Sequence, residues 1–120
     1  MIEVEKRDGS IVKFDSSKIF SAISKAFDSL HMEKDDAIIN LLVLRATADF
    51  QTKIENNRIS VEMIQDSVEK TLSESGYYPV AKTYILYRKQ RENVRKIQSS
   101  LRKVGRNSTG QMGEYPASYT

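Results

Sequence analysis

Residues 2–14 read I-E-V-E-K-R-D-G-S-I-V-K-F, and this stretch decides the fold of the N-terminal part of the chain. Apolar and charged residues alternate along its first half, which is the period of a half-buried β-strand. Asp8-Gly9 predicts a tight hairpin turn of type I′, and the β-forming residues after it predict a return strand over 10–14. Because a two-stranded hairpin is only marginally stable in water, it must pack on the segments that follow.

The first two of these segments predict helices. Asp15 or one of the two serines after it can cap a helix whose apolar residues recur three and four positions apart as far as Leu30. A second helix is expected from about Asp35 to Phe50. Its apolar run at 41–44 indicates a central, largely buried element.

Two further helices complete the predicted domain. Ser60 is a suitable N-cap for a third helix, which carries an apolar stripe and ends near Gly76. The segment just before Ser60, residues 56–58, is predicted to be a loop. Pro79 suits the first turn of a fourth helix. We therefore predict an α+β, mainly α fold, in which an N-terminal β-hairpin packs on a four-helix bundle-like domain.

The composition narrows the possible chemistry. The chain has 120 residues, no cysteine and one histidine, which excludes disulfides, thiolate-bound zinc, iron–sulfur clusters, a cysteine nucleophile and a multi-histidine metal site. No apolar run approaches the roughly 20 residues that span a bilayer, and the charged N-terminus is unlike a signal peptide. We therefore expect a cytoplasmic protein with no membrane association.

The net charge of +3 is unevenly distributed. Residues 88–106 hold eight basic side chains and one acidic one, whereas residues 1–87 hold 11 basic and 14 acidic ones. From residue 105 the chain is rich in Gly, Ser, Thr and Asn, which is typical of a linker or tail. We predict a domain over 1–98, followed over 99–120 by a basic helix extension and a flexible linker or tail.

The densest polar group in the sequence is K-R-D-G on the hairpin, with Asp15 and Lys18 at the start of the next helix. Cationic side chains beside a helix N-terminus favour an anion such as phosphate. The alternative is that Lys6 and Arg7 form the solvent face of a strand near a turn. Neither a P-loop nor a dinucleotide fingerprint occurs, so a nucleotide would need another device.

Two later segments offer further candidates. Gln65 could hydrogen-bond a base or ribose, or could be a solvated helix residue. Tyr84, Tyr87 and Arg88 could form an aromatic and cationic wall of a pocket, or the tyrosines could be core residues with wet hydroxyls. The basic segment 88–106 fits nucleic-acid binding, but its helical apolar spacing equally fits docking on a neighbouring domain or subunit.

Five blocks of the sequence resemble the ATP-cone domain, a nucleotide-sensing module at the N-terminus of many ribonucleotide reductases. The blocks are V-E-K-R-D-G at 4–9, F-D-S-S-K-I at 14–19, A-I-S-K-A-F at 22–27, I-S-V-E-M-I-Q-D-S-V-E at 59–69 and A-K-T-Y-I-L-Y-R at 81–88. They stand in the family's order and cover about residues 2–95. The residues K-R-D-G in the first block and A-K-T-Y-I-L-Y-R in the last resemble anaerobic-type reductases slightly more than the other types.

The resemblance implies that ATP or dATP, accompanied by Mg²⁺, binds between the hairpin and the helices. The implied nucleotide-binding residues are Val4, Lys6, Arg7, Asp8, Gly9, Asp15, Lys18, Val61, Gln65, Lys82 and Arg88. Among them, Lys6 and Arg7 would meet the phosphates, and Gln65 would approach the base. Lys82 and Arg88, or Lys89, would supply further phosphate charge. No catalytic residue and no metal-ligating side chain are implied.

The resemblance further implies an allosteric role, in which ATP activates and dATP inhibits a reductase by changing how domains associate. Without the cysteines of the catalytic barrel, this chain is expected to be a regulatory module and not an enzyme, as a fragment or a stand-alone sensor. Its expected partners are reductase catalytic domains or subunits and further copies of itself, in a ligand-dependent homo-oligomer. The alternative is a nucleic-acid-binding or ATP-cone transcriptional regulator fragment that uses the basic helix 88–106. The absence of the cysteine-rich zinc ribbon that precedes the cone in that repressor disfavours this alternative.

Overall fold

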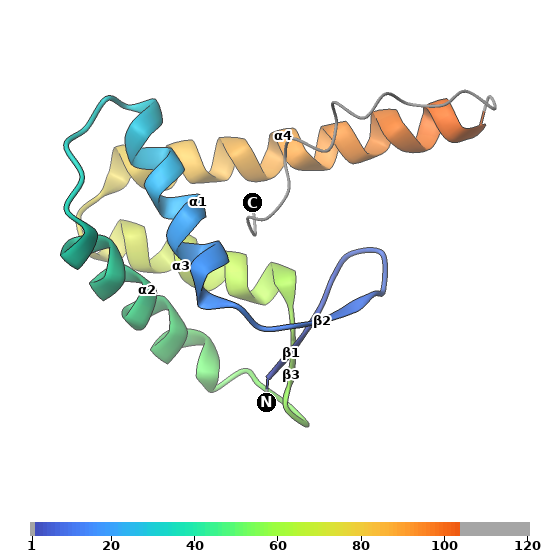
Figure 1. The fold of residues 1–120 in the computed structure, drawn as a ribbon, viewed down its shortest axis with the longest axis horizontal. Coiled ribbons are helices and arrows are strands. Elements are labelled where there is room, and N and C mark those ends of the chain that lie inside the picture. The colour runs from blue at the N-terminus through green and yellow to red at the C-terminus, as the bar shows by residue number, and fades with distance from the viewer. Residues whose placement is uncertain (1, 104–120) are drawn as a thin grey trace.

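The computed structural model describes residues 2–103, a small sheet beside four helices (Figure 1). In chain order the elements are β1 (Glu3–Glu5), β2 (Ile11–Lys13), α1 (Ser16–Ser29), α2 (Asp36–Gln51), β3 (Arg58–Ser60), α3 (Val61–Glu74) and α4 (Tyr78–Lys103). The predicted α+β, mainly α class with a hairpin on four helices is confirmed. α4 continues across the domain boundary expected at residue 98, and the predicted tail lies outside the described residues.

The sheet has three strands in the described residues, where the sequence predicted a hairpin alone. β1 pairs antiparallel with β2, which places Val4 opposite Val12, and pairs parallel with β3, which places Val4 opposite Ile59. The segment predicted as a loop at 56–58 thus runs into a strand at Arg58. Because β3 leads directly into α3, this third strand fixes the start of α3 beside the hairpin.

The type I′ turn predicted at Asp8-Gly9 is wrong. Of these two residues only Gly9 has a positive φ, 87°, and its N–H donates to the carbonyl of Lys6 at 2.9 Å. The turn therefore spans Lys6 to Gly9 inside a longer loop, and Arg7 lies outside the strand pairing. A two-residue connection with positive φ at both positions, the mark of a type I′ turn, occurs instead at Asn56-Asn57, with φ values of 53° and 60°.

The helix ends follow the sequence predictions. Asp15 and Ser60 cap α1 and α3 by accepting a hydrogen bond from a backbone N–H of the first turn, at 3.0 and 3.2 Å. Gly76 follows α3 with a φ of 88°, and the N–H of Tyr77 donates to the carbonyl of Leu72 at 2.9 Å. This is the Schellman ending, which favours glycine at the left-handed position.

One apolar core lies between the sheet and the helices. The buried apolar residues are Val4, Ile19, Ala22, Ile23, Ala26, Phe27, Ile39, Leu42, Val43, Ala46, Phe50, Ile59, Val61, Ile64, Val68, Leu72, Val80, Ala81 and Tyr84. The stripes predicted for α1 and α3 are among them, except for Leu30, which is half-buried, so their helical periods are confirmed. Phe14, half-buried beside the hairpin, meets the ring of Phe50 edge to face at 5.6 Å and ties the hairpin to α2.

The prediction that α2 is a largely buried central helix is wrong. Leu41 and Leu44, the two ends of its apolar run, are 49% and 66% exposed, and Ile38 is exposed as well. Leu42 and Val43 between them are buried. The run winds around the helix, so it cannot face one core; only one side of α2 packs on α1 and α3.

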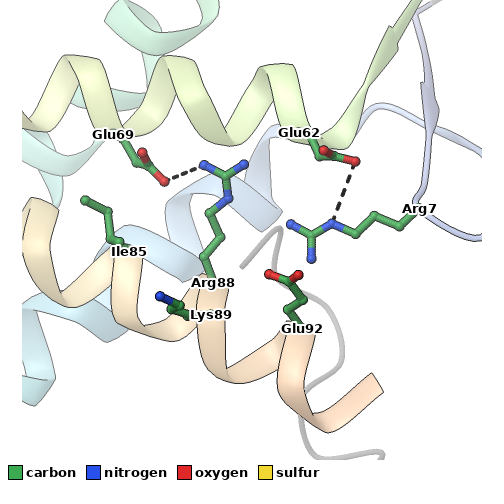
Figure 2. Close-up of a pocket in the computed structure, with 7 residues that line it drawn as sticks. All are labelled: Arg7, Glu62, Glu69, Ile85, Arg88, Lys89 and Glu92. Atoms are coloured by element: carbon green, nitrogen blue, oxygen red, sulfur yellow. Dashed lines mark hydrogen bonds and ion pairs between the residues drawn. The ribbon is translucent and has the colours of Figure 1, made fainter. Parts of the chain in front are cut away.

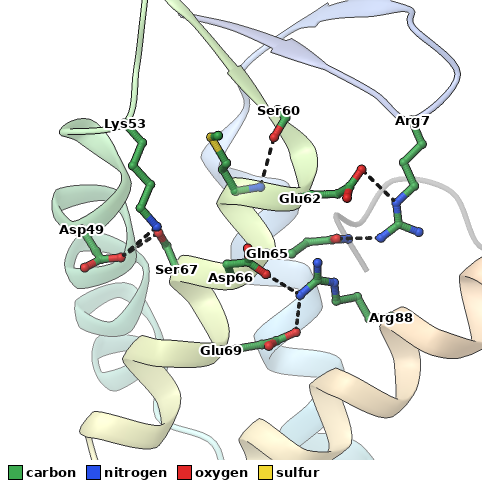
Figure 3. A network of polar contacts seen from close by, with 11 residues as sticks. Arg7, Asp49, Lys53, Ser60, Glu62, Gln65, Asp66, Ser67, Glu69 and Arg88 are labelled. Atoms are coloured by element: carbon green, nitrogen blue, oxygen red, sulfur yellow. Dashed lines mark hydrogen bonds and ion pairs between the residues drawn. The ribbon is translucent and has the colours of Figure 1, made fainter.

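A polar clamp joins α2 to α3. Asp49 on α2 accepts a hydrogen bond from the hydroxyl of Ser67 at 2.7 Å and from Nζ of Lys70 at 3.0 Å, both on α3. The Ser67 hydroxyl and the Lys70 ammonium hold the pKa of the Asp49 carboxyl below its usual value. This clamp fixes the face of α3 that lies opposite the candidate site described below (Figure 3).

The later half of α4 projects past the other helices (Figure 1). Its first turns are anchored in the core through Val80, Ala81 and Tyr84. Among residues 2–103, none of the helices combines the length and the apolar character that crossing a membrane requires.

Candidate functional site

A cavity of about 510 Å³ lies where the hairpin loop meets α3 and α4 (Figure 2). Its lining is Arg7, Glu62, Glu69, Ile85, Arg88, Lys89 and Glu92. Arg7 enters from the hairpin, the first two glutamates come from α3, and the remaining four residues come from α4. The cavity therefore joins the hairpin loop to two consecutive helices that come much later in the sequence.

Arg7 reaches from the hairpin loop onto α3. Its Nη2 donates to Oε1 of Gln65 at 2.9 Å, and its Nε lies 3.9 Å from a carboxylate oxygen of Glu62. Nη1 of Arg7 is buried and has no hydrogen-bond partner within the described part of the chain. Arg7 is thus not simply the solvent face of a strand, and one of its N–H-bearing nitrogens has no acceptor among the described residues.

Gln65 is a buried residue, with 3% of its surface exposed, so the interpretation as a solvated helix residue is wrong. Its place on α3 follows from the apolar stripe of Ile64 and Val68, which turns the neighbouring position partly inward. Burying a side-chain amide is costly unless its polar atoms are hydrogen-bonded. The contact with Arg7 meets part of that need and links α3 to the hairpin.

Arg88 projects from α4 toward α3 and meets two carboxylates there (Figure 3). Its Nη1 lies 2.5 Å from Oε1 of Glu69 and 2.9 Å from Oδ1 of Asp66. Partial burial disfavours the charge of the guanidinium, but the hydrogen bonds to Glu69 and Asp66 outweigh it and raise the pKa of Arg88. Arg88 is therefore a fixed cation in the wall of the cavity and not a solvent-facing start of the basic segment.

Tyr84 lies one turn before Arg88 and is fully buried. Its hydroxyl has no hydrogen-bond partner among the described residues, which is unusual for a buried polar atom. Burial raises the pKa of this phenol, and the charges of Arg88, Glu69 and Arg7 also act on it. Tyr84 is thus a core residue, but its hydroxyl is buried near the charged cavity and does not reach the surface as expected.

Tyr87 lies on another side of α4. Its hydroxyl contacts that of Ser29 on α1, and Nζ of Lys25 lies 5.7 Å from its ring centre. Tyr87 therefore belongs to the packing of α1 on α4, and it is not part of the lining of the cavity.

The remaining predicted site residues lie around the hairpin and on other faces. Val4 and Val61 are buried in the core, and Lys6 and Lys18 are half-buried. Asp8, Gly9, Asp15 and Lys82 are exposed. None of these eight residues lines the cavity, whose lining comes from the hairpin loop, α3 and α4 and not from the start of α1.

Two of the predicted aspartates have local structural roles. Asp8 accepts hydrogen bonds from the hydroxyl and the backbone N–H of Ser10, at 2.6 and 2.9 Å, and these lower its pKa. Asp15 accepts the same pair of bonds from Ser17, at 2.6 and 3.0 Å, which lowers its pKa as well. Both carboxylates stabilise loop and helix-cap geometry, and both stay negatively charged at neutral pH.

Sequence reasoning missed the acidic residues of the site. Glu62, Asp66 and Glu69 are spaced four and three residues apart on α3, so they share one helical face. Arg88 and Glu92 are four apart on α4. These two charged stripes on consecutive helices could have predicted a charged cleft between the helices.

The described residues contain no group of three or more His, Cys, Asp or Glu side chains that could hold a metal ion. Two carboxylates at the cavity, those of Glu62 and Glu69, are instead paired with Arg7 and Arg88. Mg²⁺ prefers several water and phosphate oxygens to an all-protein cage, so these residues fit Mg²⁺ only as a companion of a bound phosphate chain.

The sequence profile of the ATP cone domain matches residues 2–93 of this chain. The chain belongs to the ATP-cone family, whose members are regulatory nucleotide-binding domains. The match includes both strands of the hairpin, α3 and the part of α4 that carries Arg88, and so it includes every residue of the cavity.

The relatives of the chain are ribonucleotide reductases. It is 40% identical over 101 residues to a ribonucleoside-diphosphate reductase subunit alpha of Chlamydia pneumoniae, covering 79% of this chain and 10% of that protein. It is 35% identical to a vitamin B12-dependent ribonucleoside-diphosphate reductase of Mycobacterium tuberculosis (82% and 14%) and 33% identical to an anaerobic ribonucleoside-triphosphate reductase of Haemophilus influenzae (83% and 14%). The chain thus spans 10 to 14% of the length of these relatives, and the identities do not favour the anaerobic type.

Proposed function

We propose that this chain binds ATP or dATP in the cavity between the hairpin loop, α3 and α4, as an allosteric effector of a ribonucleotide reductase. One observation carries the proposal. Arg7 and Arg88 come from opposite ends of the domain and line the same cavity. Near it are two buried polar atoms, Arg7 Nη1 and Tyr84 Oη, that have no hydrogen-bond partner among residues 2–103. A phosphate-bearing ligand supplies the acceptors that such donors lack.

The phosphates are assigned to the cations of the cavity. The planar guanidinium groups of Arg7 and Arg88 can bind phosphate oxygens through two nitrogens at once, and Lys89 adds a point charge. Lys6, next to Arg7 in the loop, adds a further positive charge. In this proposal Mg²⁺ accompanies the phosphate chain and is held mainly by phosphate oxygens and water.

The nucleoside is assigned to the space between the hairpin and the helices. Gln65 has the amide donors and acceptor that can hydrogen-bond a base or ribose, and Tyr84 has a hydroxyl donor nearby. Val4 and Val61, both buried in the core, contribute apolar surroundings to this space. Asp8 and Gly9 shape the loop, while Asp15, Lys18 and Lys82 are secondary candidates at the rim.

The regulatory role is proposed from the family and the relatives. Because the relatives named above are reductases and this chain matches about a tenth of their length, we propose that the domain acts on a reductase catalytic domain or subunit. The domain is proposed to act by associating with reductase domains or with further copies of itself when a ligand binds. In this proposal the ATP-cone covers residues 1–98, and a helical connection follows it. Discrimination between ATP and dATP requires that they favour different states, since equal affinity for both states shifts nothing.

Isothermal titration of the 120-residue chain with ATP and with dATP, in the presence of Mg²⁺, tests the proposal. We expect binding at submillimolar ligand and a loss of about 1.5–3 kcal/mol for Arg7→Ala, which removes a charge-assisted hydrogen bond. Arg58→Ala is the matched control, because Arg58 is also paired with a glutamate, Glu3 at 3.2 Å, but lies away from the cavity. No binding by the unmodified chain, or equal losses for Arg7→Ala and Arg58→Ala, refutes the proposed site.

A further inference from the structure

The cavity carries as much negative as positive charge. Its lining contains three cations and three carboxylates, namely Arg7, Arg88, Lys89, Glu62, Glu69 and Glu92. Asp66 places a fourth carboxylate on Arg88. A phosphate chain that enters this cavity meets carboxylates that repel it as well as cations that attract it. A pocket that only attracts phosphate would not need these acidic side chains.

Arg88 is the cation most firmly held by these carboxylates. Asp66 and Glu69 are three residues apart on α3, so both face α4, and both bond to the same guanidinium nitrogen. The side chains of Arg88 and Glu69 are 19% and 24% exposed. Water and salt screen such a partly buried pair less than a surface pair, which makes it a strong competitor for any other anion.

A phosphate group and a carboxylate make the same demand on a guanidinium, since both accept charge-assisted hydrogen bonds from its fork. The ligand and the two carboxylates of α3 therefore compete for Arg88. We propose that Asp66 and Glu69 are built-in competing anions, which hold Arg88 in the ligand-free chain, release it to a ligand phosphate, and so set the affinity for triphosphates. This inference rests on the proposed function of the same cavity.

The exchange also changes how two helices are tied together. In the ligand-free chain, Arg88 joins α4 to α3 through Asp66 and Glu69. When Arg88 turns to a phosphate, the tie runs through the ligand instead. The affinity of the site and the strength of the α3–α4 contact are then linked, and by thermodynamic reciprocity each alters the other.

The neutral variants Asp66→Asn and Glu69→Gln test the proposal, measured by isothermal titration of the 120-residue chain with ATP and with adenosine. Each variant is expected to bind ATP about five to ten times more tightly than the unmodified chain, because one competing anion is gone. Adenosine affinity is expected to stay the same, since adenosine has no group that replaces a carboxylate. Glu74→Gln is the matched control: the same charge change on α3, away from Arg88 and the cavity, with no gain expected.

A double-mutant cycle separates competition for Arg88 from a general change in charge. In an Arg88→Gln background, Glu69→Gln is expected to give a much smaller gain in ATP affinity, because the contested cation is absent and only the direct repulsion between Glu69 and the phosphates is relieved. A gain of undiminished size in that background, or an equal gain for Glu74→Gln, overturns the proposal. Thermal melts establish that each variant is folded. Asp66 is 60% exposed, so Asp66→Asn tests the same claim if Glu69→Gln fails to fold.

The outcomes distinguish this inference from the proposed function. If the unmodified chain binds ATP and both variants bind it equally well or more weakly, Asp66 and Glu69 are not competing anions, and nucleotide binding still stands. If neither the unmodified chain nor any variant binds ATP, the proposed function and this inference both fail.

Discussion

Replacing Tyr84 with phenylalanine removes one oxygen atom from the fully buried surroundings of the cavity. The tyrosine ring packs in the core, and its hydroxyl lies among the charges of Arg88, Glu69 and Arg7 without a hydrogen-bond partner in the described residues. The phenylalanine ring can keep the same packing. The substitution therefore tests whether this hydroxyl serves the ligand and not the fold.

The magnitude follows from the burial. A buried polar group without a partner costs about 1–3 kcal/mol of desolvation, so Tyr84→Phe should raise the free energy of unfolding of the ligand-free chain by about 1 kcal/mol. For a domain of this size that corresponds to an increase in Tm of about 4–8 °C. If the hydroxyl bonds to the nucleotide, the same change should weaken ATP binding by about 0.5–1.5 kcal/mol, roughly two- to twelvefold.

Urea denaturation and titration calorimetry measure the two effects on the same preparations. Tyr87→Phe is the matched control, since the Tyr87 hydroxyl contacts Ser29 and is not part of the cavity lining. It is expected to leave ATP affinity unchanged and to lower stability slightly or not at all. The signature of Tyr84→Phe is thus a gain in stability together with a loss in affinity.

The stability result and the affinity result can each contradict the prediction. A free energy of unfolding that falls by more than about 1 kcal/mol in Tyr84→Phe would mean that the hydroxyl stabilises the fold, which contradicts the reasoning from its missing partner. A gain in stability with unchanged ATP affinity would leave the fold argument intact and remove Tyr84 from the ligand contacts.

Two further predictions concern the scaffold that holds the site. Asp49→Asn weakens the α2–α3 clamp and should lower the free energy of unfolding by about 1–2 kcal/mol at pH 7. The pKa of Asp49 is lower in the folded state than in the unfolded state, where it is about 3.9. The stabilisation that the ionised carboxylate gives the fold is therefore complete above about pH 3.9 and is lost as the pH falls through the folded-state pKa. Urea denaturation of both proteins across this range should therefore show the difference shrinking in acid, and a difference that grows there would contradict the assignment. Gly76→Ala places a Cβ on a residue whose φ of 88° is left-handed, and it should lower the free energy of unfolding by about 1 kcal/mol. Thermal or urea denaturation measures this change. An unchanged or raised stability would show that the ending of α3 tolerates a Cβ.

Most of the helical fold could be predicted from the sequence because α1 and α3 have a clear apolar period and a recognisable cap. Asp15, Ser60 and Gly76 mark helix ends through local hydrogen bonding, which sequence alone specifies. The third strand was missed because a strand as short as β3 has no readable period, and its existence depends on pairing with β1. The exposure of Leu41 and Leu44 was missed because an apolar run does not specify which side of a helix meets the core.

The candidate site was predicted in part. Arg7, Gln65 and Arg88 were named from the sequence, and the structure brings Arg7 onto Gln65 and places both arginines in the lining of one cavity. The roles of Asp66 and Glu69 could not be predicted, because they depend on how α4 packs on α3. Such long-range geometry is a tertiary property that no local spacing encodes.

Nuclear magnetic resonance titration of the isotopically labelled chain with dATP and Mg²⁺ tests the proposed cavity most directly, because it reports on each residue separately. The largest shifts are predicted for the hairpin loop at 6–10, for α3 around Gln65, and for α4 around Tyr84 and Arg88. Small shifts are predicted for the groove of about 490 Å³ beside β3, which serves as an internal control. No shifts at millimolar dATP, or shifts confined to the groove beside β3, would contradict the assignment of this cavity as the nucleotide site.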